Sequence, residues 1–196
     1  MKVILISGKS QSGKDQLAYF MDEKARARGL RCVIIHFADL VKYFARAHFG
    51  YTGDKTKPEE RQILQTLGTD IVRNADPDYW AEVVARYLYA CKDEFDIACI
   101  PDVRFPNEID VVDRYFPTDD YLVRIVRKNP DDTDYYNPFM TPEQLHHESE
   151  TALDSYYGYD DYIINRTLRD LENSADAILD RVALINHPMK TYFMDL

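Results

Sequence analysis

A glycine-rich stretch between an apolar run and an amphipathic one is the feature that most restricts the fold of this chain. The first 29 residues read, in order, MKVILIS, GKSQSGK and DQLAYFMDEKARARG. The apolar run predicts a buried strand, and Leu17, Met21 and Ala25 recur at helical spacing. The sequence therefore predicts a strand, a tight loop and a helix in direct succession.

Residues 8–15 fit seven of the eight positions of the phosphate-binding pattern G-x-x-x-x-G-K-[ST]. In that pattern the glycines let backbone N–H groups point at phosphate oxygens, and the helix N-terminus adds partial positive charge. An ordinary glycine turn is the alternative, but the flanking strand and helix favour a phosphate-binding loop. We expect ATP to bind the following residues: Gly8, Lys9, Ser10, Gln11, Ser12, Gly13, Lys14, Asp15 and Gln16.

Composition restricts the size of the protein and the class of its partners. A chain of 196 residues that is 45% hydrophobic can bury one core, so we expect a single domain over residues 1–196. The net charge of −10 argues against a nucleic-acid-binding protein, whose affinity would rest on a broad basic face. A small anionic ligand must therefore be held by a local group of basic side chains.

The cysteines and the lengths of the apolar stretches indicate where in the cell the protein is expected. The three cysteines are odd in number and form no C-x-x-C pair, which favours a reduced, cytoplasmic protein. The N-terminal apolar run is too short for a signal peptide, and no stretch approaches the ~20 apolar residues of a membrane span. We expect a cytoplasmic location and no membrane association.

Five strand-like apolar runs alternate with helical patterns along the chain. The runs lie at residues 2–7, 31–38, 95–101, 121–127 and 161–167, and helices are predicted over residues 58–73, 76–93 and about 168–185. Alternation of this kind, with nearly all-apolar strands, predicts a parallel sheet covered on both faces. The fold class is therefore α/β, a three-layer α/β/α P-loop NTPase fold with a mostly parallel five-stranded sheet.

One long stretch, residues 128–150, is rich in Asp, Pro and Tyr and lies between two strand-like runs. A loop of this length is usually functional or disordered. In a phosphate-transferring enzyme the functional form is a lid that excludes water, whereas plain surface disorder is the alternative. We expect a lid insertion at about residues 128–147, referred to below as the lid segment.

Two strand ends carry carboxylates next to basic residues. Asp102 follows the apolar run at 95–101 and is two residues before Arg104, which suits either an acidic Mg²⁺ ligand or a local ion pair. Asp39 follows the run at 31–38 and precedes Lys42; it suits either a site carboxylate or a helix N-cap.

Other candidates stand out less from their surroundings. Arg73 and Arg127 are favoured over the remaining basic residues by their positions, one before NADPDYW and the other at the start of the lid segment. His146 and His147 lack metal-ligand spacing. The aromatic pair Tyr79 and Trp80 is typical of a core-facing helix more than of a base-stacking pair.

Together these motifs resemble the bacteriophage deoxynucleoside monophosphate kinase family. The stretches that carry the resemblance are SGKSQSGKD, HFADLVK, LQTLGTDIVRNADPDYW, PDVRFPNEID, HHESE and DYIINRT, which run in order from residue 7 to residue 167. The chain is similar also to animal phosphomevalonate kinase, which shares an S-G-K-D loop and an E-S-E-x-x-L-D stretch. In both groups an Asp commonly follows the loop lysine. Gln16 departs from them, since a Thr is frequent there, which leaves open which side chain contacts Mg²⁺.

The resemblance implies an ATP-dependent phosphotransferase that converts a (deoxy)nucleoside 5′-monophosphate to the diphosphate, with Mg²⁺ as cofactor. It implies catalytic roles for Lys14 on the donor phosphates, Arg104 on the acceptor phosphate and Arg127 in the lid. The metal would be held by Asp15 and Asp102. The resemblance assigns Asn165 to the nucleotide and the following residues to the acceptor: Asp39, Lys42, Arg73, Trp80, Arg104 and Glu150.

Several alternatives remain open on the sequence alone. A nucleoside kinase would use Asp39 as the base for a sugar hydroxyl, and a phosphomevalonate-like kinase would act on another monoester. A protein that binds ATP without turnover is the third alternative, and the missing hydroxyl after Lys14 favours it. The sequence also leaves open which bases and which sugar are accepted, whether the two histidines have a role, and whether the protein is a monomer or a homodimer. If the protein is viral, we expect it in the host cytoplasm.

Overall fold

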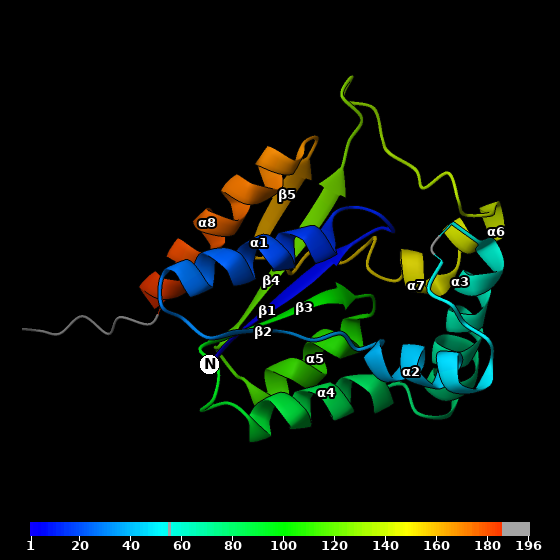
Figure 1. Cartoon of the computed structure of the whole chain (residues 1–196), viewed down its shortest axis with the longest axis horizontal. Coiled ribbons are helices and arrows are strands. Elements are labelled where there is room, and N and C mark those ends of the chain that lie inside the picture. Colours follow the sequence, from blue (N-terminus) through cyan, green and yellow to red (C-terminus); the bar gives the residue numbers. More distant parts are fainter. Residues whose placement is uncertain (55, 186–196) are drawn as a thin grey trace, which may run out of the picture.

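A parallel sheet lies at the centre of the molecule (Figure 1). The computed structural model describes residues 1–54 and 56–185. Its strands are β1 (Lys2–Gly8), β2 (Cys32–Ile34), β3 (Ile97–Val103), β4 (Asp120–Arg127) and β5 (Asp161–Asn165). In the described residues these form one sheet of order β2-β3-β1-β4-β5, and each neighbouring pair is parallel. The predicted α/β class and five-stranded sheet are confirmed.

Helices cover both faces of this sheet. Their bounds are α1 (Lys14–Ala27), α2 (Asp39–His48), α3 (Pro58–Gln65), the π-helical η1 (Thr66–Arg73), α4 (Tyr79–Ala90), α5 (Pro106–Tyr115), α6 (Pro142–Leu145), α7 (Glu148–Thr151) and α8 (Leu168–Ile185). Figure 1 shows α1 and α8 on one face and α4 and α5 on the other. None of the helices in the described ranges is long and apolar enough to cross a membrane.

The alternation of side chains along β1 explains the three layers. Val3 and Leu5 pack with residues of α4 and α5, whereas Ile4 and Ile6 pack with residues of α1 and α8. All four side chains are fully buried. Since successive residues of a strand face opposite sides, an uninterrupted apolar run is what a strand between two helical layers requires.

The second strand is shorter than its apolar run. The sequence predicts a strand over residues 31–38, but β2 ends at Ile34 and the chain turns into α2. The Asp102 carboxylate accepts hydrogen bonds from the backbone N–H groups of Phe37 (2.9 Å) and Ala38 (3.0 Å), which holds this turn. A carboxylate 64 residues away thus captures donors that would otherwise continue the sheet.

The helix predicted over residues 58–73 is divided into α3 and the π-helical η1. Gly68 of η1 lies against α2, because a Cβ built there would stand 3.4 Å from Cγ1 of Val41. The Gly68 carbonyl accepts a hydrogen bond from the indole N–H of Trp80 (3.0 Å). Wider helical turns of this kind occur frequently at functional sites.

The lid segment runs from the end of β4 across to α3 (Figure 1). Tyr135 donates its hydroxyl hydrogen to Oε1 of Gln11 (2.6 Å), and Asn137 donates to Oγ of Ser10 (3.0 Å). Further along, the side-chain amide of Gln144 donates to the carbonyl of Pro58 (2.8 Å). The segment therefore contacts both the phosphate-binding loop and the first turn of α3, and its movement as a lid stays a prediction.

Candidate active site

The phosphate-binding loop connects β1 to α1 through two glycines that no larger residue could replace without strain. Gly8 has a φ of +154°, and a Cβ there would stand 2.6 Å from the carbonyl oxygen of Ile125. Gly13, the residue before α1, has a φ of +103°, and a Cβ there would stand 2.7 Å from Nδ2 of Asn165. Both positions need glycine for its backbone freedom and for its lack of a side chain.

Lys14 is the first residue of α1 and lies folded back over the loop. Its ammonium donates to the carbonyls of Gly8 and Lys9, at 2.7 Å each. Burial, followed by the positive charge of Arg104, holds the pKa of Lys14 well below its usual value. A phosphate group would supply the negative charge that stabilises the charged form of a buried lysine. The position of Lys14 therefore suits the binding of an anion.

Asn165, at the end of β5, supports the loop from behind. Its Nδ2 donates to the carbonyl of Ser12 (2.7 Å), and the residue is buried. The resemblance assigns Asn165 to the nucleotide. The structure places it against Gly13 on the inner side of the loop, where it positions backbone groups.

Glu150, in α7, joins the loop to two arginines. Its Oε2 accepts from the backbone N–H of Ser10 (2.9 Å), and its Oε1 accepts from Arg61 and from Arg104 (2.7 Å). Burial would raise the pKa of this carboxyl, but Arg104, Arg61 and Lys14 outweigh it and lower the pKa. Glu150 is thus an ionised, buried carboxylate among cations, the kind of partner that a phosphate oxygen would also be.

A histidine between two carboxylates lies beside the start of α1. The ring of His36 lies 3.2 Å from Oδ1 of Asp15 and 3.4 Å from Oδ1 of Asp39. Burial opposes a charged ring, yet hydrogen bonds with these two carboxylates raise the pKa of His36 to about 9. Asp39 also pairs with Lys42 (3.3 Å), and although burial acts the other way, its bonds with His36 lower its pKa strongly. Asp39 is therefore held ionised next to positive charge.

Asp102 lies near the end of β3, and Asp15 lies in the first turn of α1, which the phosphate-binding loop joins to β1, the neighbour of β3 in the sheet. Both line one cavity, and each Asp102 oxygen already accepts one backbone N–H. A carboxylate oxygen has lone pairs beyond one hydrogen bond. The pair therefore fits Mg²⁺, which takes one or two carboxylates and completes its shell with water and phosphate oxygens.

Arg73, at the end of η1, is held in place by α5 and the residue before it. Its guanidinium stacks on the Phe105 ring, 3.6 Å from the ring centre, and donates to Oδ1 of Asn107 (2.8 Å). It also pairs with Glu108 (3.4 Å). Burial raises the pKa of Glu108 to about 7, although the backbone N–H groups of Arg104 and Phe105 and the charge of Arg73 act in the opposite direction.

Two cavities meet at the phosphate-binding loop. The first, the α3 cavity, has a volume of about 300 Å³ and lies among the loop, α2, α3, η1 and α4. The second, the α1 cavity, has a volume of about 320 Å³ and lies along the start of α1 beside Arg127. Gln11, Lys14 and Asp15 line both, so the loop lysine stands between them.

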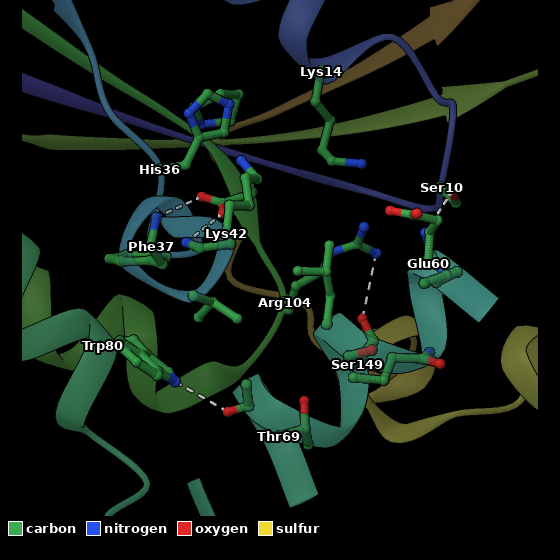
Figure 2. A pocket seen from close by; sticks show the side chains of 18 of the residues that line it. Ser10, Lys14, His36, Phe37, Lys42, Glu60, Thr69, Trp80, Arg104 and Ser149 are labelled. Carbon is green, nitrogen blue, oxygen red and sulfur yellow. Dashed lines mark hydrogen bonds between the residues drawn. The ribbon is translucent and has the colours of Figure 1, made fainter. Parts of the chain in front are cut away.

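The α3 cavity brings most of the predicted site residues together. Figure 2 shows Lys14 and Arg104 reaching into it from different sides, with Lys42 and Trp80 on its wall. The predicted residues that line it are Ser10, Gln11, Lys14, Asp15, Lys42, Arg73, Trp80, Asp102 and Arg104. Trp80 is buried, as expected of a core residue, whereas Tyr79 beside it is 43% exposed and does not face the core.

Arg127 lies on the other side of the loop. Its guanidinium donates to the carbonyl of Gln11 (2.8 Å) and stands 3.9 Å from the centre of the Tyr135 ring. Arg127 lines the α1 cavity together with residues of the loop. The lid segment thus begins at an arginine that contacts the loop backbone.

Several polar residues that line the α3 cavity are absent from the residues predicted as sites, among them His36, Arg61, Gln65 and Glu108. As a pattern, Arg61 is one basic residue among several, and its pairing with Glu150 spans 89 positions. Glu108 stands three residues after Phe105 and accepts its backbone N–H, as the Glu of a capping box does, but Phe105 lacks the side-chain oxygen that completes this motif in a sequence. One partner of His36, Asp39, is only three residues away, whereas the other, Asp15, is 21 residues away.

Comparison with known proteins agrees with this geometry. Residues 50–145 match the family model described as deoxynucleotide monophosphate kinase. No curated protein gives a significant match. Among solved structures, the chain is similar to the APS kinase from Mycobacterium tuberculosis in complex with AMPPNP and APS, with 12% identity and a TM-score of 0.55, covering 93% of this chain and 97% of that one.

A gluconokinase from Sinorhizobium meliloti 1021 is similar too, with 14% identity and a TM-score of 0.54, covering 95% of this chain and 98% of that one. At such identities the likeness shows the P-loop kinase fold, and the family match adds the activity. The resemblance to deoxynucleotide monophosphate kinases is thereby confirmed over residues 50–145, and the chain is an ATP-dependent phosphotransferase.

Proposed function

We propose that the protein transfers the γ-phosphate of ATP to the phosphate of a (deoxy)nucleoside 5′-monophosphate, giving the diphosphate. The observation that carries this is the meeting of two cavities at one lysine, Lys14. A reaction between two phosphates needs two sites whose phosphate ends converge, and positive charge between them. The family match over residues 50–145 supports the choice of a nucleotide as acceptor.

On the donor side, ATP lies with its phosphates on the loop between Gly8 and Asp15. The N–H groups of the loop and the start of α1 bind the phosphate oxygens, and Lys14 leaves the carbonyls of Gly8 and Lys9 for the β- and γ-phosphates. Arg127 stands on this side, because it lines the α1 cavity. The lid segment that follows Arg127 excludes water when it closes.

On the acceptor side, Arg104 and Arg73 bind the acceptor phosphate, with Lys42 in support. Arg61 joins them, because its guanidinium lines the same cavity and its Nε is buried with no hydrogen-bond partner among the described residues. A phosphate monoester is largely ionised near pH 7, so the attacking oxygen needs no strong base. The arginines instead hold two phosphates in line against their mutual repulsion.

Glu150 acts through the arginines. A carboxylate would repel an acceptor phosphate, and the Glu150 carboxylate contacts Ser10, Arg61 and Arg104. It keeps both guanidinium groups at the edge of the loop until a phosphate oxygen takes its place beside them. We therefore assign Glu150 a positioning role in place of the direct substrate contact implied by the resemblance.

The cofactor would be held by Asp15 and Asp102, and Asp15 in turn is held by His36 (3.2 Å). When bound there, Mg²⁺ supplies positive charge to the phosphates and lowers the cost of the charge that develops during transfer. Asp39 has its charge engaged by His36 and Lys42, and its lowered pKa makes it a poor general base. This argues against a nucleoside kinase, which would have to deprotonate a sugar hydroxyl.

A panel of acceptors tests the proposal. ADP release from ATP is measured with each of the four deoxynucleoside monophosphates, the ribonucleoside monophosphates, the nucleosides and phosphomevalonate. We expect turnover with monophosphates of nucleosides and none with unphosphorylated nucleosides. Turnover with phosphomevalonate alone, or with nucleosides alone, would assign the chain to another class of kinase.

A further inference from the structure

A polar group of α3 faces the α3 cavity without a partner. Gln65 is 6% exposed, lines the cavity, and has a buried Nε2 that makes no hydrogen bond with any described residue. An unpaired buried amide is costly, by roughly 1–3 kcal/mol, and proteins rarely leave one. The mechanism proposed above leaves Gln65 unused, so the amide needs a partner from the ligand.

The helix itself sets where that ligand group must lie. Gln65 comes four residues after Arg61, so the two side chains share one face of α3 and their backbones are about 6 Å apart along its axis. Arg61 contacts Glu150 and Oγ of Ser10, which places its end of the helix at the phosphate-binding loop. Gln65 therefore lies at the end of the cavity away from the phosphates.

The walls around this end suit a flat ring. Phe37, Val41, Leu64 and Trp80 line the cavity, and the indole N–H of Trp80 is already bound to the Gly68 carbonyl. Apolar and aromatic walls with one placed polar group are typical of sites that bind and orient a ring. A nucleoside monophosphate carries its base and its phosphate at opposite ends of the sugar, which matches this arrangement of Arg61 and Gln65.

We propose that Gln65 is a specificity-determining residue that reads the base of the acceptor nucleotide, donating its Nε2–H to an acceptor atom on the edge of the base. The proposal rests on the proposed function, since it requires a nucleotide in the α3 cavity. A hydrogen bond made by a buried donor gives discrimination, because a base that presents a donor at the same place leaves both donors unpaired.

Base profiles of two variants test this role. In Gln65→Met the hydrogen bond is lost while the volume is kept, so KM for the preferred monophosphate rises about 10-fold and the ratio of kcat/KM between the best and worst base falls by a similar factor. In Gln65→Glu the side chain keeps its shape but only accepts hydrogen bonds, so the preference moves towards bases that present an amino group there. KM for ATP stays within about twofold in both.

Gln62→Met is the matched control. Gln62 lies on the exposed face of the same helix, where its Nε2 donates to Oγ1 of Thr66 (3.2 Å), and its substitution leaves the base profile unchanged.

If Gln65→Met does not fold, the base profile of the near-isosteric Gln65→Glu variant tests the role of Gln65 by itself. Wild-type turnover of monophosphates with an unaltered base profile in the folded Gln65 variants overturns the role of Gln65 only. Failure of the wild type to use any nucleoside monophosphate overturns this role and the proposed function together.

Discussion

At the scale of single residues, Lys14 lines both cavities, and its substitution tests the phosphate-binding loop most directly. Its ammonium is buried against loop carbonyls, so within residues 1–54 and 56–185 Lys14→Ala removes hydrogen bonds to the loop and breaks no salt bridge. We expect the fold to persist and kcat to fall about 10²–10³-fold, the usual effect of removing one donor to developing charge. Lys92→Ala, at an exposed position beside Tyr89, is the control. Near-wild-type turnover of Lys14→Ala would rule out this loop as the phosphate site.

Arg104 tests the acceptor side. One of its nitrogens, Nη1, reaches both the Ser149 carbonyl (3.3 Å) and Glu150 (2.7 Å), and only a guanidinium can bind two such partners in a fixed plane. Arg104→Lys keeps the charge but loses that geometry. We expect KM for the monophosphate to rise roughly 10- to 100-fold, equivalent to about 1.5–3 kcal/mol, with little change for ATP.

The matched substitution Arg114→Lys changes an exposed arginine of α5 that pairs with Asp78, and should leave both KM values unaltered. If Arg104→Lys alters KM for ATP alone, Arg104 belongs to the donor side.

Because Glu108 is buried and its pKa is raised, its contribution to the free energy of unfolding decreases as pH rises. Its pKa rises from an unfolded value of 4.5 to about 7 in the fold. The folded state therefore holds a proton that the unfolded state has released, and the contribution of Glu108 to stability declines as pH rises from about 4.5 to about 7. Above pH 7 it is constant.

Denaturant unfolding of wild type and Glu108→Gln at pH 5, 6, 7 and 8 measures this. The free energy of unfolding of the wild type, relative to the variant, should fall by on the order of 3 kcal/mol between pH 5 and pH 7.5 and then level off. A difference that stays constant or grows with pH would show that Glu108 is not protonated in the folded protein near neutral pH.

At the scale of elements, the lid segment links the two sites. It contacts Gln11 and Ser10 of the loop through Tyr135 and Asn137, and it reaches Pro58 of α3 through Gln144. If it closes over both nucleotides, its backbone should open less often when both sites are filled. Hydrogen exchange in residues 128–147 should slow most with a two-headed bisubstrate analogue, and less with ATP analogue or monophosphate alone. Exchange that is equally fast with and without the analogue would leave no role for a lid.

Two element boundaries could not be predicted from the sequence, and the contacts of these elements show why. The run at residues 31–38 reads as one strand, yet it ends at Ile34 because the Asp102 carboxylate binds the N–H groups of Phe37 and Ala38. The helix at residues 58–73 has one continuous amphipathic pattern, and its division at Thr66 coincides with contacts to Val41 and Trp80. Both outcomes depend on partners that are remote in sequence, so local propensity cannot give them.

At the scale of the whole molecule, the apolar runs and the glycine-rich loop were sufficient for the fold. Five buried strands separated by helices leave few arrangements, and the observed order sets β1 between β3 and β4. That order places Asp102 beside the phosphate-binding loop, as the sequence predicts. What the sequence leaves out are pairings between distant segments, such as Arg61 with Glu150 and His36 with Asp15. The contact of Glu150 with Arg61, on which its proposed positioning role rests, is one of these pairings, and direct contacts of Glu150 and Asn165 with ligands stay predictions.

The central claim, direct transfer from ATP to a nucleoside monophosphate, is tested most directly by following the transferred group. The wild-type protein is incubated with ATP carrying ¹⁸O in its γ-phosphate and with the monophosphate that gives the fastest ADP release, and the products are identified by mass spectrometry. The account predicts the label in the terminal phosphate of the nucleoside diphosphate, in a one-to-one ratio with ADP. Label found only in inorganic phosphate would contradict it.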